Sequence, residues 1–205
     1  MKFKIFTLGL LIILSCSLSA QEKRSMKRSI GFTFSAFDDS NSNVIHSKIL
    51  DGGASYSCKK VYTFGVSYIH PIRPWIDIES GIEYSNHTIT VKPMTMPDME
   101  YSYSEYDKDI SLINIPVTAR INFLKYLFFN GGTILDLEVG SSSPINNQTG
   151  LGVLFGIGAK YNLNNGIGAF INGYSKIHSL VSFSSDYHYR RLIDGGLRIG
   201  IMYSF

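Results

Sequence analysis

The amino-acid sequence predicts an all-β fold, an eight-stranded antiparallel up-and-down transmembrane β-barrel preceded by a cleaved signal peptide. Three observations predict it. Eight segments alternate apolar and polar residues, the connections between them are alternately long and tight, and the first twenty residues have the order of a secretory signal. With 205 residues, 44% hydrophobic and 17% charged, the chain is too apolar for disorder and has the length of one barrel domain.

The first residues have the three parts of a secretory signal peptide. Lys2 and Lys4 give it a basic start, residues 5–14 form an uncharged apolar run, and residues 15–20 are mostly small. We therefore predict cleavage after Ala20. A retained membrane helix is disfavoured because the apolar run is shorter than the roughly 20 residues that span a bilayer.

Cleavage at this point divides the chain into three predicted parts, which are the signal peptide 1–20, a short basic leader 21–28 and the barrel domain 29–205. A lipoprotein with Cys16 as its lipid acceptor is the second interpretation of the same segment, because the residues before Cys16 loosely match a lipobox. After cleavage only Cys58 remains, so the fold needs no internal disulfide.

Beyond the signal, apolar residues recur at every second position, which is typical of half-buried strands. Eight segments have this pattern, namely 29–37, 61–70, 75–90, 110–123, 127–139, 151–163, 167–183 and 193–205. Each is long enough to cross a bilayer when tilted. The recurrence carries the prediction, because a single alternating segment is a weak signal.

The alternation assigns an apolar face to each segment, opposite a face of polar residues and glycine. In the first four segments the apolar faces hold Ile30, Phe32, Phe34 and Ala36; Tyr62, Phe64, Val66 and Tyr68; Ile76, Ile78, Ile82 and Tyr84; and Ile113, Ile115, Val117, Ala119, Ile121 and Phe123. In the last four they hold Phe129, Leu135, Leu137 and Val139; Leu151, Val153, Phe155, Ile157, Ala159, Tyr161 and Leu163; Ile167, Ala169, Ile171 and Ile177; and Ile193, Leu197, Ile199, Ile201, Tyr203 and Phe205.

The connections between the segments alternate in length. The odd-numbered connections are long and comprise 38–60, 91–109, 140–150 and 184–192, whereas the even-numbered ones are tight and comprise 71–74, 124–126 and 164–166. Asn165 and Gly166 form a turn dipeptide, because both residue types tolerate positive φ. Long loops at one rim and tight turns at the other are typical of outer-membrane barrels, whose tight turns face the periplasm.

Alternation alone leaves open which face is inside, and a soluble calyx that carries an apolar ligand would point its apolar face inward. Two observations favour an apolar exterior. Glycine on the polar face suits the crowded interior of a small barrel. Aromatic residues gather near the tight turns, as an interfacial girdle would, and comprise Tyr68, Trp75, Phe123, Tyr126, Phe129, Tyr161 and Phe205.

The polar face carries charges of both signs, which we predict to form a structural ion-pair network in the lumen. The predicted members are Asp77, Glu79, Glu83, Arg120, Asp136, Glu138, Lys160, Lys176, Asp194 and Arg198. The alternative interpretation of such charges is a solvated surface. Eight strands leave an interior just wide enough for side chains, so a general diffusion porin is disfavoured.

Three features carry a resemblance to a known family: the Ala20-Gln21 junction, the motif Asn114-Ile115-Pro116-Val117, and the terminal strand 195–205. With them, the mature chain resembles the small bacterial outer-membrane β-barrel family, comparable in scale to OmpX and most similar to the PorT-type barrels of Bacteroidetes. Pro116 removes a ladder donor in mid-strand, and we expect a bulge there.

This resemblance implies a location in the bacterial outer membrane, with the leader 21–28 in the periplasm and outer-membrane lipids around the barrel. It implies that Tyr203 and Phe205 form a terminal assembly signal for the barrel-assembly machinery. It also implies a second candidate role, as an accessory of protein secretion or surface attachment.

A function beyond structure would have to lie in the long outer loops. The segment 91–109 is the best candidate binding surface, because Tyr101, Tyr103 and Tyr106 give adaptable contact area at low entropic cost. The partner, extracellular or part of a secretion system, is not identified by the sequence. The alternative is that some of these residues only extend the strands beyond the membrane.

We expect no catalytic residue, no cofactor and no metal site. The five histidines, His46, His70, His87, His178 and His188, share no metal-ligand spacing. Ser185, Asp186 and His188 are too close in sequence to expect triad geometry, so a lipid-modifying enzyme is only an alternative hypothesis. Removing Lys2 and Lys4 from the 19 basic residues leaves 17 against 16 acidic ones, a balance that does not suggest a nucleic-acid partner.

Overall fold

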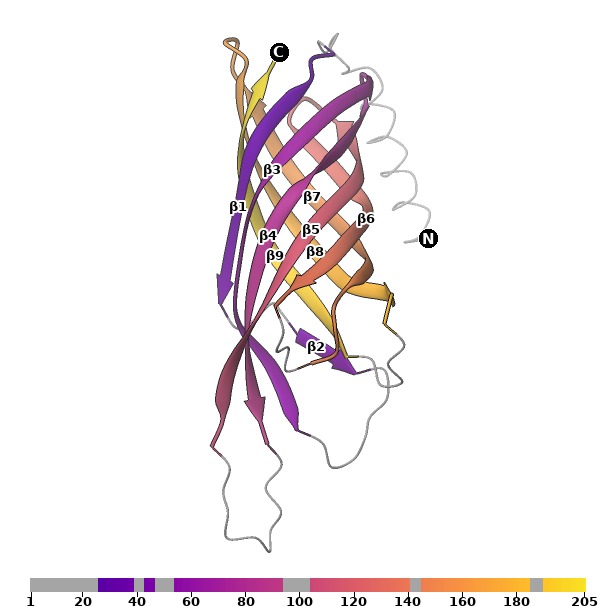
Figure 1. The fold of residues 1–205 in the computed structure, drawn as a ribbon. Helices are drawn as coiled ribbons and strands as arrows, with labels where there is room; N and C mark the ends of the chain where they lie inside the picture. The colour runs from indigo at the N-terminus through magenta and orange to yellow at the C-terminus, as the bar shows by residue number, and fades with distance from the viewer. Residues whose placement is uncertain (1–25, 39–42, 47–53, 94–103, 141–144, 185–189) are drawn as a thin grey trace, which may run out of the picture.

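A computed structural model describes residues 26–38, 43–46, 54–93, 104–140, 145–184 and 190–205. The predicted signal peptide, Cys16 and the first residues of the leader lie outside these ranges. The described residues form one antiparallel β-sheet with the order shown in Figure 1. Within these ranges, no helix is both long enough and apolar enough to cross a membrane.

The sheet contains nine strands. They are β1 (Ser29–Asp38), β2 (Asn43–His46), β3 (Ser55–Arg73), β4 (Ile76–Lys92), β5 (Tyr106–Phe123), β6 (Leu127–Val139), β7 (Gly150–Asn162), β8 (Ile167–Ser182) and β9 (Arg190–Ser204). From β3 onward each strand pairs with the next in sequence. The tight turns, the start of β1 and the end of β9 all lie at one rim of the barrel (Figure 1).

Pairing between the first and last strands closes the sheet into a ring. β1 pairs with β3 on one side and with β9 on the other, from Ser29 opposite Ser204 to Phe34 opposite Ile199. The Phe205 amide extends this seam by donating to the Arg28 carbonyl at 2.9 Å. The eight-stranded antiparallel up-and-down barrel predicted from the sequence is therefore confirmed, and closure removes the exposed sheet edges.

The short strand β2 continues the path of β1 along the sheet. β2 runs antiparallel to both β9 and β3, as β1 does, and pairs with them beyond the end of β1, with Asn43 opposite both Ile193 and Ser57. The connection predicted over 38–60 therefore contains this strand and the first residues of β3. The sequence did not indicate it because residues 38–60 have no two-residue alternation, and the pairing comes from the neighbouring strands.

Strand lengths differ around the ring. β3, β4 and β5 contain 19, 17 and 18 residues, whereas β6 and β7 contain 13 each. Pairing between β3 and β4 continues as far as Ser55 opposite Lys92, and pairing between β4 and β5 as far as Val91 opposite Tyr106. These three strands therefore reach past the rest of the barrel at the long-loop rim (Figure 1). We call residues 55–60, 88–92 and 106–109 the β3–β5 extension.

The tight turns follow from local conformation. Leu124, in the turn between β5 and β6, has φ of +56°, and Gly166, between β7 and β8, has φ of +88°. Asn165 does not share the positive φ; its side-chain oxygen instead accepts a hydrogen bond from the Ile167 amide at 3.1 Å. The left-handed position of this turn is therefore occupied by the residue without a side chain.

The expected bulge at Pro116 is wrong. Ser80 opposite Val117 and Glu83 opposite Asn114 belong to one unbroken register of β4 and β5. The ladder instead skips the residues between them, because the proline nitrogen cannot donate. On its other side Pro116 stays opposite Ile134 of β6. The alternating burial on both flanks holds the register, since a one-residue slip would turn every following side chain to the other face.

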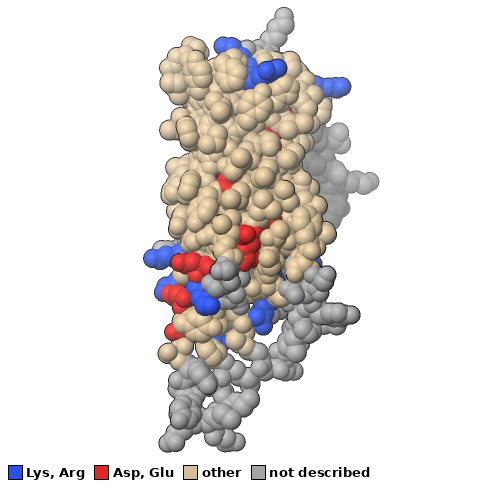
Figure 2. Space-filling model, viewed as in Figure 1, with Lys and Arg blue, Asp and Glu red and all other residues tan. Residues whose placement is uncertain are grey.

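The apolar faces point outward and the polar faces inward. Phe32, Phe155 and Ile201 are 75%, 63% and 66% exposed, whereas Asn114 and Asn172 are fully buried in the lumen. On the face seen in Figure 2, charged side chains gather toward the two ends, and the band between them is mostly uncharged. The barrel thus has the inverted polarity that the glycines and aromatic residues predicted.

Two apolar clusters lie at the ends of the lumen. The outer plug, near the long loops, comprises Ile89, Ile110, Leu112, Ile145 and Leu192, with Tyr56 packed against it. The inner plug, near the tight turns, comprises Ile69, Phe128, Phe170 and Met202. The charged groups of the lumen lie mainly between these two clusters.

Candidate functional site

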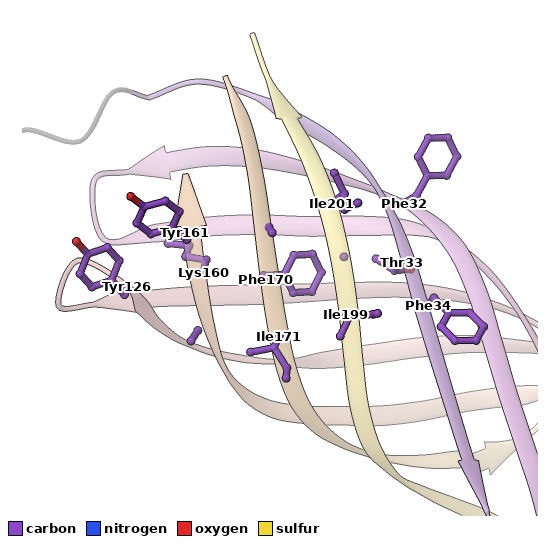
Figure 3. A pocket seen from close by; sticks show the side chains of 13 residues that line it. Phe32, Thr33, Phe34, Tyr126, Lys160, Tyr161, Phe170, Ile171, Ile199 and Ile201 are labelled. Carbon is purple, nitrogen blue, oxygen red and sulfur yellow. The ribbon is translucent and has the colours of Figure 1, made fainter. Parts of the chain in front are cut away.

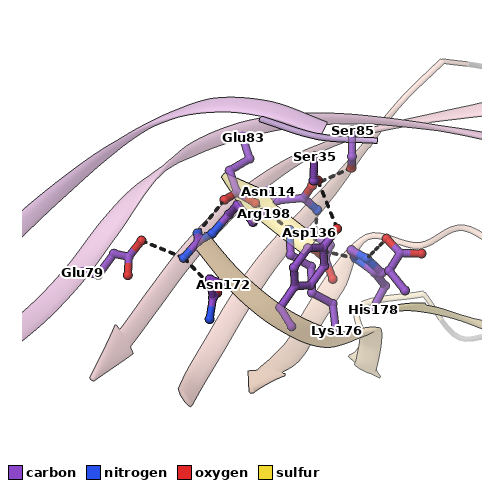
Figure 4. Close-up of polar contacts among 12 residues, drawn as sticks. Ser35, Glu79, Glu83, Ser85, Asn114, Asp136, Asn172, Lys176, His178 and Arg198 are labelled. Atoms are coloured by element: carbon purple, nitrogen blue, oxygen red, sulfur yellow. Dashed lines mark hydrogen bonds and ion pairs between the residues drawn. The ribbon is translucent and has the colours of Figure 1, made fainter. Parts of the chain in front are cut away.

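The central ion-pair network contains two carboxylates and three cations, all buried. Arg198 donates to Glu79 at 3.0 Å through Nη2 and to Glu83 at 3.1 Å through Nη1 (Figure 4). Lys176 Nζ donates to the second oxygen of Glu83 at 2.6 Å, and Arg120 Nη2 to the second oxygen of Glu79 at 2.8 Å. Each carboxylate therefore bridges two cations, which is the condition under which buried charge is tolerated.

Aromatic rings join this network to the inner plug. The Arg120 guanidinium lies 4.1 Å from the Phe128 ring centroid and 5.0 Å from that of Phe170. On the other side of the network, Lys176 lies 5.1 Å from the Tyr174 ring. These cation–π contacts stabilise charges that are buried away from the surface.

Asp77 and Lys160 meet through an asparagine near the tight turns. The Asn122 side-chain amide donates to Asp77 at 2.8 Å, and Lys160 donates to the Asn122 side-chain oxygen. The two predicted charges are thus brought together, with Asn122 as the intermediate that sequence reasoning did not single out.

A second polar cluster lies in the outer half of the lumen. Asp194 Oδ2 contacts His87 Nε2 at 2.7 Å and His178 Nε2 at 3.0 Å, and the other His178 nitrogen lies 3.1 Å from Asp136. Asn114 donates to Asp136 at 2.6 Å. Both imidazoles are fully buried.

The two histidines were not among the predicted members of the network, although a signal for them was present. His87 lies four residues after Glu83 and His178 two residues after Lys176, so each continues the inward face of its strand. The search for metal-ligand spacing along the chain could not find them, because they are 91 positions apart in the sequence and only the closed barrel brings them together.

Glu138 lies at the mouth of the lumen and not among the central ion pairs. Its carboxylate accepts a hydrogen bond from the Gln148 amide at 2.6 Å, and its own amide donates to Thr149 at 3.1 Å. The Gln148 side chain donates in turn to the Arg190 carbonyl at 2.8 Å. Glu138 therefore organises the segment that leads into β7 and brings Ile145 over the lumen.

The candidate binding segment 91–109 is only partly a loop. Tyr101 and Tyr103 lie outside the described residues, whereas Tyr106 is the first residue of β5 and is 48% exposed. Lys92, at the end of β4, and Glu105, the residue before β5, form an exposed ion pair at 3.0 Å. Tyr106 therefore belongs to a strand, and its part in a binding surface stays a prediction.

Asp107 has the best-defined electrostatics of the β3–β5 extension. Its carboxylate accepts hydrogen bonds from Thr90 Oγ1 at 2.7 Å and from Lys59 Nζ at 2.9 Å. These two hydrogen bonds, the one from Thr90 first, hold the pKa of Asp107 below its ordinary value. The neighbouring Thr88 makes the equivalent bond to Asp109 at 2.7 Å.

The outer surface has an apolar hollow of about 900 Å³ next to the β1–β9 seam. Phe32 and Phe34 project beside it from β1, and the stacked rings of Tyr126 and Tyr161, 6.0 Å apart, lie at its other end (Figure 3). Lys160 and Phe170, which also line it, point into the barrel. The hollow is therefore a gap between outward rings, over a wall of small side chains.

The predicted assembly signal lies at the end of this seam. Tyr203 and Phe205 are 54% and 58% exposed, and both belong to the outward apolar face. Their exposure leaves both rings accessible on the finished barrel.

Comparison with solved structures gives a fold match. The outer membrane protein OprG from Pseudomonas aeruginosa matches with a TM-score of 0.58 and 13% identity, over 90% of this chain and 98% of that one. The translocator domain of the autotransporter NalP from Neisseria meningitidis matches with a TM-score of 0.36 and 12% identity, over 97% and 95% of the two chains.

Comparison of the sequence gives no relatives, because no family model and no curated protein matches. The likeness to OprG supports the small-barrel fold alone. Membership of the PorT-type family stays a prediction.

Proposed function

We propose that this chain is an integral outer-membrane protein whose barrel is surrounded by lipid and whose lumen is a structural core and not a pore. One observation carries the proposal. Apolar side chains such as Ile82, Phe155 and Ile199 are 62%, 63% and 52% exposed on strands all round a closed ring. Soluble proteins rarely expose contiguous apolar patches larger than a few hundred Å², so lipid is the medium that suits this surface.

The dimensions agree with a bilayer. Even β6 and β7, with 13 residues each, rise about 33 Å along the barrel axis when tilted by about 40°, which exceeds the apolar band of about 25 Å. Cations crowd the tight-turn rim, where Lys27, Arg28, Arg73 and Lys125 are all exposed. Such residues favour the anionic headgroups of the periplasmic leaflet.

The polar lumen argues against the soluble calyx hypothesis. A carrier of apolar ligands needs an apolar cavity, whereas the centre of this lumen holds Arg198, Glu79, Glu83 and their partners. The two plugs lie at either end of those charges. The interior therefore serves to hold the strands together.

We infer that the working surface is the extracellular one, formed by the β3–β5 extension and the loops beside it. The extension is braced by the contact of Lys59 with Asp107 between β3 and β5, and at its end by the contact of Lys92 with Glu105, the residue before β5. A stiff, charged platform that carries tyrosine suits binding without catalysis. An accessory role in protein secretion, and a lipid-modifying activity, stay alternative hypotheses without a contact in their favour.

Membrane fractionation tests the location. We expect the full chain to sediment with the outer membrane, to need detergent for extraction, and to migrate faster on gels when unheated than when boiled. Recovery in the soluble periplasm, without a heat-dependent shift in migration, would refute the proposal.

Surface proteolysis tests the orientation and the exposed platform. We expect protease added to intact cells to cut within 91–109 and to leave the turn at 124–126 intact, while both are cut in permeabilised cells. Protection of 91–109 on intact cells would place the long loops on the wrong side for an extracellular partner.

A further inference from the structure

We propose that His87, His178 and Asp194 form a binding site for one divalent transition-metal ion of the Zn²⁺ type. The site lies in the outer half of the lumen, next to the outer plug. Ile89 and Leu192 of that plug lie next to His87 and Asp194 on the same inward faces, each two residues away toward the long-loop rim. The inference goes beyond the proposed outer-membrane role and does not depend on it.

The three side chains converge from strands on both sides of the lumen. His87 projects from β4, and His178 and Asp194 from the neighbouring strands β8 and β9. One potential ligand atom from each lies within 4.8 Å of the other two. Two imidazole nitrogens and one carboxylate oxygen are ligands that Zn²⁺ and similar ions prefer, with water completing a four-coordinate site.

The surroundings of His178 resemble the outer shell of a metal site. Its Nδ1 lies 3.1 Å from an Asp136 oxygen, which leaves Nε2 directed at Asp194. Asp136 is held in turn by Asn114 at 2.6 Å and by the Ser179 amide at 3.1 Å. A carboxylate on the far nitrogen of a metal-binding histidine fixes the ring orientation and raises its basicity (Figure 4).

The backbone of β8 departs from regular geometry at this site. Val153 pairs with Ile177 and Leu151 with Val181, so residues 178–180 bulge opposite Gly152. Ser179 has φ of +46°, and it is buried together with His178, which breaks the alternation of inward and outward residues. Bulges and left-handed non-glycine residues concentrate at functional sites, where they redirect side chains.

The hydrogen bonding of the cluster is incomplete among the described residues. His87 Nδ1, His178 Nδ1 and Asp194 Oδ1 are buried there without a hydrogen-bond partner, so the 3.1 Å approach of His178 Nδ1 to Asp136 is a charge contact without hydrogen-bond geometry. Asp194 Oδ2 receives both imidazoles. Buried polar atoms are normally satisfied. The oxygens of Glu79 and Glu83, a few residues away, all have cationic partners, so the His87–His178–Asp194 cluster differs from the rest of the lumen.

Metal analysis of the refolded full chain tests the proposal. The chain is unfolded in urea with chelator and refolded into detergent, with or without ZnCl₂, because the ligands are buried in the folded barrel. After gel filtration we expect about one Zn²⁺ per chain in the wild type. His87→Asn and His178→Asn should each weaken Zn²⁺ binding at least tenfold, since outer-shell changes alone cost about 10–100-fold.

His70→Asn is the matched control, because it also removes a histidine. His70 lies on the outer surface, with its ring stacked on that of Tyr68 at a centroid distance of 6.4 Å. The variant should bind Zn²⁺ as the wild type does. Visible absorption of the Co²⁺-loaded protein gives a second readout, since tetrahedral Co²⁺ bands should be present in the wild type and lost in His87→Asn.

Wild-type protein without bound metal would overturn the proposal and leave a hydrogen-bonded cluster only. So would equal Zn²⁺ binding in the wild type and both histidine variants. If His178→Asn fails to show heat-dependent migration, and so has not folded, His87→Asn and Asp194→Asn decide the question.

Discussion

Arg198 shows how a single side chain contributes to this fold. It reaches Glu79, Glu83 and Asn172 from β9, at 3.0, 3.1 and 3.4 Å, so it ties strands on opposite sides of the lumen. Buried networks of this kind specify one arrangement of the strands, because any change leaves a buried charge unpaired.

We predict that Arg198→Leu destabilises the barrel by about 3–5 kcal/mol, because it leaves the two carboxylates short of a cation. Thermal or urea unfolding in detergent measures the change. The control is Lys59→Leu, which removes a half-exposed partner of Asp107 and should cost less than about 1 kcal/mol. Equal unfolding midpoints for Arg198→Leu and the wild type would show that Arg198 does not stabilise the lumen.

A second prediction concerns Asp107 in the β3–β5 extension. Its pKa is lowered on folding, so its hydrogen bonds stabilise the extension above the ordinary carboxyl pKa, and this contribution is lost as the pH falls through the lowered value. Thr90→Val removes the larger cause and should raise the pKa of Asp107, measured by NMR titration of the carboxyl carbon. Thr88→Val removes a hydroxyl bound to Asp109 instead and should leave the pKa of Asp107 unchanged; an unchanged pKa in Thr90→Val would contradict the assignment.

At the scale of the strand, glycine decides how closely the lumen can fill. A Cβ on Gly158 of β7 would lie 2.3 Å from the Phe128 ring of the inner plug and 2.6 Å from the Ile171 carbonyl. The neighbouring strand has a glycine with the opposite surroundings, since a Cβ on Gly173 of β8 would meet nothing nearer than 3.8 Å. Substituting alanine at each position therefore distinguishes the cost of a steric clash, expected at Gly158, from the effect of alanine on the backbone alone, expected at Gly173.

We predict that Gly158→Ala lowers the free energy of unfolding by about 1–3 kcal/mol, because Phe128 and the backbone must move to admit the methyl group. Gly173→Ala should be neutral or slightly stabilising, because alanine loses less conformational entropy than glycine. Unfolding in detergent compares the two. Similar effects of both substitutions would show that the lumen is not packed against β7 as described.

For the whole molecule, the lumen is filled along its length. The outer plug, the two polar clusters and the inner plug follow one another from the long loops to the tight turns. A hollow of about 250 Å³ near the tight turns, lined by Ser29, Arg120 and Met202 among others, reaches the inner plug from the tight-turn rim. Eight strands leave room for side chains and not for a channel.

We therefore predict that the purified protein gives no steady ion conductance in planar lipid bilayers. A known diffusion porin, reconstituted in the same way, is the positive control for insertion. Regular conductance steps from the wild-type chain would contradict the filled lumen. A variant such as Glu79→Ala, which leaves Arg120 and Arg198 each short of a partner, would then show whether the ion-pair network gates the path.

A structural feature was predictable from the sequence where it depends on residues close together in the chain, and not where it depends on contacts between distant strands. The two-residue alternation depends on neighbours in the sequence, so it predicted the strands and placed Glu79 and Arg198 on the polar faces. The glycines on those faces and the aromatic residues near the tight turns then predicted that the apolar faces point outward. The alternation did not predict the partners, because these depend on the stagger between strands. Pro116 illustrates the limit: the missing donor was readable, but the way the ladder accommodates it was set by the register on both flanks.

The sequence by itself determined the eight-stranded barrel, its inverted polarity and the charges it buries, since side-chain direction in a strand is a local property. Only the tertiary structure decided that β2 continues β1 and that the two plugs lie at the ends of the lumen. It also decided that His87 meets His178 and Asp194. Those contacts join strands on opposite sides of a closed ring, and the closure and the stagger that create them belong to no single segment of the chain.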